Sequence, residues 1–269
     1  MTTTTLPRHG RAPGAPGPLA ALIAREPTLA RYGIAMWLAM IPAALALGLD
    51  ERMLREAPIW LKPLKFLASV GLFALTTAWF IGLLPEARRR AWPVRAAVWT
   101  LMVAGGFEIA YITLQAALGT GSHYNVGDPV HAALYSAMAA AAIAMTATQP
   151  VIAWQIARHG DLARGSAWRT SVLWGLSLTF VLGTVSGMVL GGMQPPSGGG
   201  MPLTGWHITG DLRPAHFVGL HAHQALPLAG AALASIAPRG ARLWLVAGIV
   251  VYVVGWAVLM AAGLSGRTA

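Results

Sequence analysis

Residues 242–264 read RLWLVAGIVVYVVGWAVLMAAGL, a run whose only charged residue is the first, Arg242. A helix needs about 20 apolar residues to cross the hydrocarbon core of a bilayer, and this run is long enough. The whole chain shares its character, since 56% of the 269 residues are hydrophobic and only 10% are charged. In soluble domains about a quarter of the residues are charged. The sequence therefore predicts an integral membrane protein.

Six more windows of similar length and composition precede this run. The sequence thus predicts an all-α polytopic membrane protein, a bundle of seven transmembrane helices within residues 28–266. Residues 1–27 are rich in Pro and Gly, and we expect a disordered cytoplasmic tail with a short interfacial helix at 18–25. Pro150, near the end of the fourth window, predicts a kink or an early exit from the membrane. The six windows are 29–48, 60–84, 96–118, 130–156, 170–193 and 214–236.

The positions of the basic residues predict the orientation of the bundle. With the N-terminus inside, 13 of the 19 Lys and Arg residues fall in cytoplasmic segments, as the positive-inside rule requires. We therefore expect a cytoplasmic N-terminus, an external C-terminus and a place in a bacterial inner membrane. The six remaining basic residues are Arg52, Arg55, Lys62, Lys65, Arg213 and Arg267.

Charge and cysteine content exclude several classes of function. The net charge of +10 comes from arginines in short loops and not from a stripe on one face, so we expect no nucleic-acid partner. The chain has no cysteine, which excludes Cys-ligated zinc, iron–sulfur clusters and disulfides. The bilayer is the first expected partner.

Histidines gather in the segment GDLRPAHFVGLHAHQALPLAG, residues 210–230. On one continuous helix, His216 and His223 would share a face, and His221 and Gln224 would form an adjacent one. Asp211 and Arg213 precede them. The outer half of the membrane is predicted to hold six of the eight histidines, and the segment 194–213 would cover them as a lid. These six are His123, His131, His207, His216, His221 and His223.

Glu108 lies near the middle of the window 96–118. An acid at that depth costs about 2.5–3.5 kcal/mol on insertion scales, so it must face protein or water. Tyr111 and Gln115 continue a polar stripe toward the outer side, and the three are the candidate catalytic residues. The alternative is a protonated carboxyl that is hydrogen-bonded to a neighbouring helix.

Lys62 and Lys65 share a face near the start of the window 60–84. Both could extend to the outer headgroups. Alternatively, Lys65 points inward to an acid or an anionic ligand.

The histidines suggest a redox function first. Neutral imidazoles on two helices at matching depth suit a haem iron, which makes His131 and either His216 or His221 candidate haem ligands, with Gln224 beside them. A divalent metal is the other cofactor considered. A lipid-soluble small molecule such as a quinone is a further candidate partner. The candidate metal ligands are His123, His216, His221 and His223.

Two other functions stay open. A proton- or cation-coupled transporter would use Glu108, although no internal repeat is evident. An intramembrane zinc hydrolase would resemble the ceramidase and adiponectin-receptor superfamily, which has seven spans and a cytoplasmic N-terminus. That family carries a His-x-x-x-His pair on its last span, whereas residues 242–264 contain no histidine.

Two resemblances rest on specific segments. KPLKF at 62–66, SHYN at 122–125 and GDLRPAHFVGLHA at 210–222 are similar to segments of a family of bacterial multi-pass membrane proteins. This resemblance implies the topology and no particular reaction. Residues 190–217, LGGMQPPSGGGMPLTGWHITGDLRPAHF, locally resemble the outer loop and the following helix of haem A synthases, which implies haem binding by His216 or a neighbour.

Overall fold

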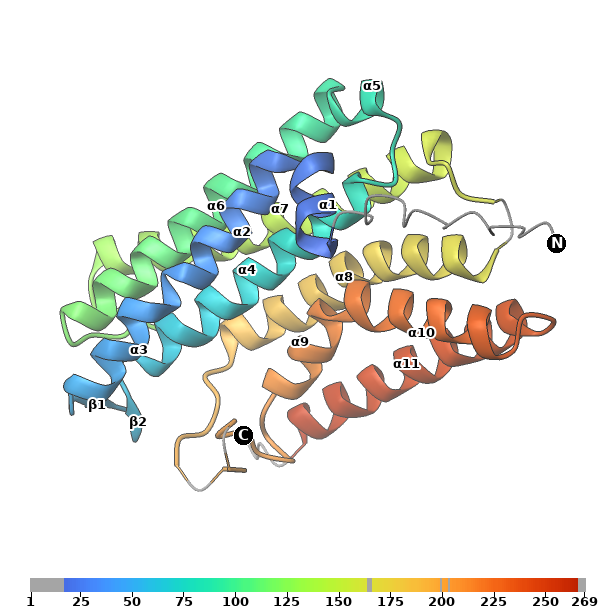
Figure 1. Cartoon of the computed structure of the whole chain (residues 1–269). Coiled ribbons are helices and arrows are strands. Elements are labelled where there is room, and N and C mark those ends of the chain that lie inside the picture. The colour runs from blue at the N-terminus through green and yellow to red at the C-terminus, as the bar shows by residue number, and fades with distance from the viewer. Residues whose placement is uncertain (1–16, 164–165, 199, 203, 266–269) are drawn as a thin grey trace, which may run out of the picture.

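The computed structural model describes residues 17–163, 166–198, 200–202 and 204–265, and within them the chain is almost entirely helical (Figure 1). The predicted tail at 1–16 lies outside the described residues. The short helix expected at 18–25 is present as α1, Pro18–Arg25. The first half continues with α2 (Pro27–Leu38), α3 (Met40–Leu49), the two-residue strands β1 (Met53–Leu54) and β2 (Ala57–Pro58), α4 (Leu61–Ile81), α5 (Glu86–Arg89), α6 (Trp92–Ala117) and α7 (Pro129–His159).

The second half comprises α8 (Ala167–Gly192), α9 (Arg213–Leu220), α10 (Ala222–Ile236) and α11 (Ala241–Leu264). In the part of the chain that the structure describes, six helical segments are long and apolar enough to cross a membrane: α2 with α3, then α4, α6, α7, α8 and α11. This supports a multi-pass membrane protein and confirms the all-α class. Exposed apolar side chains such as Val251 and Leu243 of α11 fit a lipid-facing surface.

The predicted sixth span, 214–236, is not one helix. It is divided at His221, where φ is −92° and ψ is 9°, into α9 and α10. Each piece is too short to cross a bilayer alone, although together they cover Arg213–Ile236. The predicted faces assumed one continuous helix. Beyond the break, His221 and Gln224 are still neighbours, as expected, with His221 Nδ1 and Gln224 Oε1 at 3.1 Å.

Pro150 does not end its helix. The helix α7 continues through it to His159, so the proline does not interrupt the helix. Proline lacks a backbone N–H, so one helical hydrogen bond is missing there. Membrane helices tolerate such a loss where neighbouring helices pack against the site.

Loops that the sequence placed on one side of the membrane lie at the same end of the bundle. At one end Arg52 donates to the carbonyl of Ala117 and Arg55 to that of Pro195, at 3.2 and 2.6 Å. At the other end Arg95 pairs with Glu26 at 3.0 Å. Figure 1 shows β1, β2 and the C-terminal end of α11 at the former end, and α5 at the latter. We call the end carrying the β1–β2 hairpin the outer end.

The core that positions the site lies along α8. Gly175, Gly183 and Gly187 let α9 and α10 approach closely. A Cβ on Gly183 would lie 2.8 Å from Leu220, and a Cβ on Gly219 would lie 2.8 Å from the carbonyl carbon of Leu182. Small residues at such crossings are typical of membrane helices.

Candidate functional site

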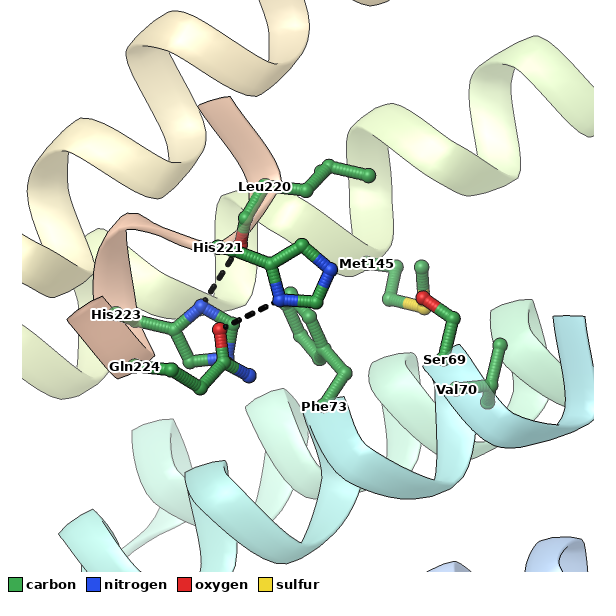
Figure 2. Close-up of a pocket in the computed structure, with 8 residues that line it drawn as sticks. All are labelled: Ser69, Val70, Phe73, Met145, Leu220, His221, His223 and Gln224. Carbon is green, nitrogen blue, oxygen red and sulfur yellow. Dashed lines mark hydrogen bonds between the residues drawn. The ribbon is translucent and has the colours of Figure 1, made fainter. Parts of the chain in front are cut away.

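The break between α9 and α10 leaves polar backbone groups that side chains satisfy. The carbonyl of Val218 accepts from the hydroxyl of Tyr252 at 2.5 Å, and the N–H of His223 donates to Thr179 Oγ1 at 2.9 Å. The carbonyl of Leu220 faces the ring of His223 at 3.0 Å (Figure 2). In a bilayer an unsatisfied group costs several kcal/mol, so these partners stabilise the irregular backbone.

His223 is fully buried, and its contacts settle its tautomer. Its Nδ1 faces two acceptors, the Leu220 carbonyl and Thr179 Oγ1, the second at 3.1 Å. Thr179 itself donates to the carbonyl of Gly175. Nδ1 therefore carries the hydrogen, and Nε2 accepts from the amide of Gln224 at 3.1 Å. Since both ring nitrogens are occupied, His223 is a structural residue and not a free ligand.

The hydrogen bonds of Gln224 also determine the tautomer of His221. Its amide nitrogen donates to His223 Nε2 and to Thr76 Oγ1, the latter at 3.2 Å. Its oxygen therefore accepts from His221 Nδ1 at 3.1 Å. A neutral His221 with its hydrogen on Nδ1 has a lone pair on Nε2. In Figure 2 that nitrogen points away from Gln224, toward the side on which Met145 lies.

A small cavity of about 30 Å³ lies beside this histidine. Its walls come from α4, α7 and the α9–α10 break, as Figure 2 shows. That volume suits one water molecule or one ligand oxygen. The lining residues are Ser69, Val70, Phe73, Met145, Leu220, His221, His223 and Gln224.

An apolar groove of about 460 Å³ adjoins the same glutamine, which lines both spaces. Trp79 and Leu228 on its rim are exposed, so it opens toward lipid. Pockets for small organic molecules have volumes of this order and few polar groups. The groove is lined by Leu22, Leu75, Thr76, Trp79, Trp168, Gln224, Pro227, Leu228 and Ala231.

A second polar group lies toward the outer end. Glu108 is buried in α6 at 5% exposure, and Lys62 of α4 acts on it electrostatically without a direct ion pair. Lys62 also lies 5.9 Å from the ring of Phe66. For Lys65 the sequence left an outward and an inward orientation open. Lys65 is exposed and donates to the carbonyl of Thr204 at 3.4 Å, which fits the outward orientation.

The expected polar stripe on α6 does not act as one unit. Gln115 hydrogen-bonds to the hydroxyl of Thr120, whereas the hydroxyl of Tyr111 is buried and has no partner among the described residues. Val70 and Met145, which line the His221 cavity, also pack against Gly105, one turn below Glu108. An apolar layer separates the two sites.

The other predicted histidines have separate partners. His131 pairs with Asp128 at 2.5 Å, and His216 faces Ser186 Oγ at 3.2 Å. The ring of His123 lies 5.8 Å from Phe66, and burial, with Lys62 and His216 nearby, lowers its pKa to about 3.

Asp211 and Arg213 fix the start of α9. Their side chains pair at 2.7 Å, and Asp211 also accepts the N–H of His207. Burial alone would raise the pKa of Asp211, but these hydrogen bonds hold it below its ordinary value. Arg213 also donates to the carbonyl of Gly205, which ties the predicted lid segment to α9.

These positions bear on the cofactor predictions. Within the described residues no three His, Cys, Asp or Glu side chains are grouped so that they could hold a metal ion. The predicted haem ligands His131 and His216 each have a different side-chain partner.

The sequence did not indicate Thr76 or Thr179, which are polar residues within apolar helices. Only their depth in the spans could have drawn attention to them.

Comparison of the chain with protein-family models, with curated proteins and with solved structures found no match. The functional argument therefore rests on the geometry of the site.

Proposed function

We propose that this chain is a seven-span inner-membrane protein that binds a lipid-soluble molecule with a hydroxyl-bearing head group, a quinol above all. One observation carries the proposal: Gln224 lines both the lipid-facing groove and the His221 cavity. A ligand can therefore place its apolar body in the groove while its head group reaches an imidazole inside the protein.

The hydrogen-bond pattern favours a ligand that donates. The Gln224 oxygen holds the hydrogen of His221 on Nδ1, which leaves Nε2 as an acceptor. One hydroxyl of a quinol meets that requirement, and the small cavity beside His221 has room for that single oxygen atom. The amide of Gln224 is already bonded to Thr76 and His223, so it orients His221 rather than the ligand.

Tryptophan fluorescence provides the test, because Trp79 and Trp168 line the groove. We expect a short-tailed benzoquinol to quench the fluorescence of the purified protein in nanodiscs with saturation. His221→Ala removes one hydrogen bond of about 1–1.5 kcal/mol and should weaken the affinity about tenfold. His159→Ala, at the end of α7 and outside the lining of both spaces, is the control. Quenching that does not saturate, or an unchanged affinity in His221→Ala, would refute the proposal.

Proton- or cation-coupled transport is the second candidate function. A helix broken inside a bundle is a common feature of transporter binding sites, and α9–α10 has that form. Uptake of a solute into vesicles driven by a proton gradient, without quinol binding, would favour this alternative.

A further inference from the structure

Two buried hydroxyls on or beside α6, those of Tyr32 and Tyr111, have no hydrogen-bond partner among the described residues. Glu108 is buried as well, and Lys62 is partly buried. These four side chains come from α2, α4 and α6. Buried polar groups are nearly always hydrogen-bonded, and ordered water supplies the bonds that protein does not.

The two charged groups of this region, on Lys62 and Glu108, have opposite signs but form no direct ion pair. Lys62 and Glu108 act on each other electrostatically, yet no nitrogen–oxygen distance between them is within 4.0 Å. A separated pair in a poorly polar interior is costly unless polar molecules lie between the charges. The hydroxyl of Tyr32 is also near, because a Cβ on Gly105 would lie 2.9 Å from it. Water between Lys62 and Glu108 would satisfy both charged groups and the Tyr32 hydroxyl.

The outer surface is the closest source of that water. His123 follows α6 in the loop at the outer end, has Lys62 and His216 near it, and contacts Ser122 through Nδ1 at 3.2 Å. Arg55 of the hairpin acts on Lys62. On the inner side, Val70 and Met145 form an apolar barrier. A proton can thus reach Glu108 from outside while the barrier blocks its passage to His221.

We propose that Glu108 is a proton-binding site that exchanges with the outer side through water held by Lys62 and Tyr32. The charged and titratable groups that face it are Tyr32 from α2 and Lys62 from α4. Tyr111 adjoins it on α6, and the outer end of α7 contributes Asp128 and Tyr135 farther away. The site is independent of quinol binding, so either proposal can fail alone.

Infrared spectroscopy of the protein in lipid tests the proposal directly. A protonated carboxyl has a carbonyl stretch that shifts in deuterium oxide. We expect one such band that shifts quickly in deuterium oxide, disappears at alkaline pH and is absent from Glu108→Gln. Lys62→Met should change the pH at which the band disappears. Glu86→Gln is the matched control, because Glu86 is exposed and pairs with Arg90 at the opposite end.

Two results would overturn the inference. One is a band that persists in Glu108→Gln. The other is a Glu108 band that neither exchanges in deuterium oxide nor responds to pH while the protein stays folded, which would show a sealed structural acid. Circular dichroism of each variant establishes that loss of the band is not loss of the fold.

Discussion

His223 shows at the scale of one residue how burial decides between ligand and structural roles. The sequence grouped it with three other histidines as a metal ligand, yet its exposure is 0% and both ring nitrogens are bonded. We expect His223→Leu to lower the free energy of unfolding by about 1–3 kcal/mol, because it leaves the Leu220 carbonyl and a Gln224 N–H unpaired. Thermal melting in detergent measures this loss. His131→Ala, at a partly exposed position, should leave the melting temperature nearly unchanged, and equal losses would contradict this role.

His123 should make stability depend on pH. Its pKa in the folded protein is about 3, below the ordinary value of 6.5. Between these values the unfolded chain binds a proton that the folded chain does not, so stability decreases as pH falls from 6.5 toward 3. The slope from this group is at most about 1.4 kcal/mol per pH unit. Melting curves across this range should be flatter for His123→Phe, and an identical slope would exclude the residue as the source.

The sequence indicates candidate site residues where a polar side chain falls inside an apolar span. Glu108, His221 and Gln224 stand out because such side chains are costly in a membrane. Their partners did not stand out. Thr76 and Thr179 come from helices far away in sequence, and no local pattern places them beside His221 or His223.

At the scale of elements, close helix crossings hold the broken span in place. A Cβ on Gly219 would meet the backbone of Leu182 and Gly183 at 2.8–2.9 Å, and backbone cannot move aside cheaply. Gly219→Ala should therefore separate α9 from α8 and lower the melting temperature by several degrees. Gly248→Ala on α11 is the matched control, since no atom lies within 4 Å of its added Cβ. A similar loss in both variants would show that helix propensity, and not this crossing, is responsible.

Element boundaries followed from hydropathy wherever the helix is regular. The windows at 60–84 and 242–264 differ from α4 and α11 by at most three residues at either end. The break at His221 was not predicted, because the segment retains apolar composition and nearly helical hydrogen bonds on both sides. Its cause is tertiary: Thr179 and Tyr252 replace bonds that the helix would make itself.

At the scale of the molecule, the two ends of the bundle differ in charge, and this difference predicts its orientation. One end carries Arg88, Arg89, Arg90 and Arg95, and Arg89 also donates to the carbonyl of Leu84 between α4 and α5. The outer end carries fewer cations, and ion pairs with acids occur at both ends. Because the positive-inside rule counts Lys and Arg rather than net charge, the end with more of them should stay in the cytoplasm.

The absence of cysteine makes that orientation testable with single introduced thiols. Ser197, in the outer loop, and Ala87, in α5, are both exposed and lie at opposite ends. On intact cells a membrane-impermeant maleimide should label Ser197→Cys but not Ala87→Cys, and both should react after the cells are opened. A periplasmic reporter fused after Ala269 should likewise be active. The reverse labelling pattern would show that the protein has the opposite orientation in the membrane. The fold fixes the distance from Glu108 to the outer-end loops, so these loops would then face the cytoplasm. The Glu108 site would in that case exchange protons with the cytoplasm.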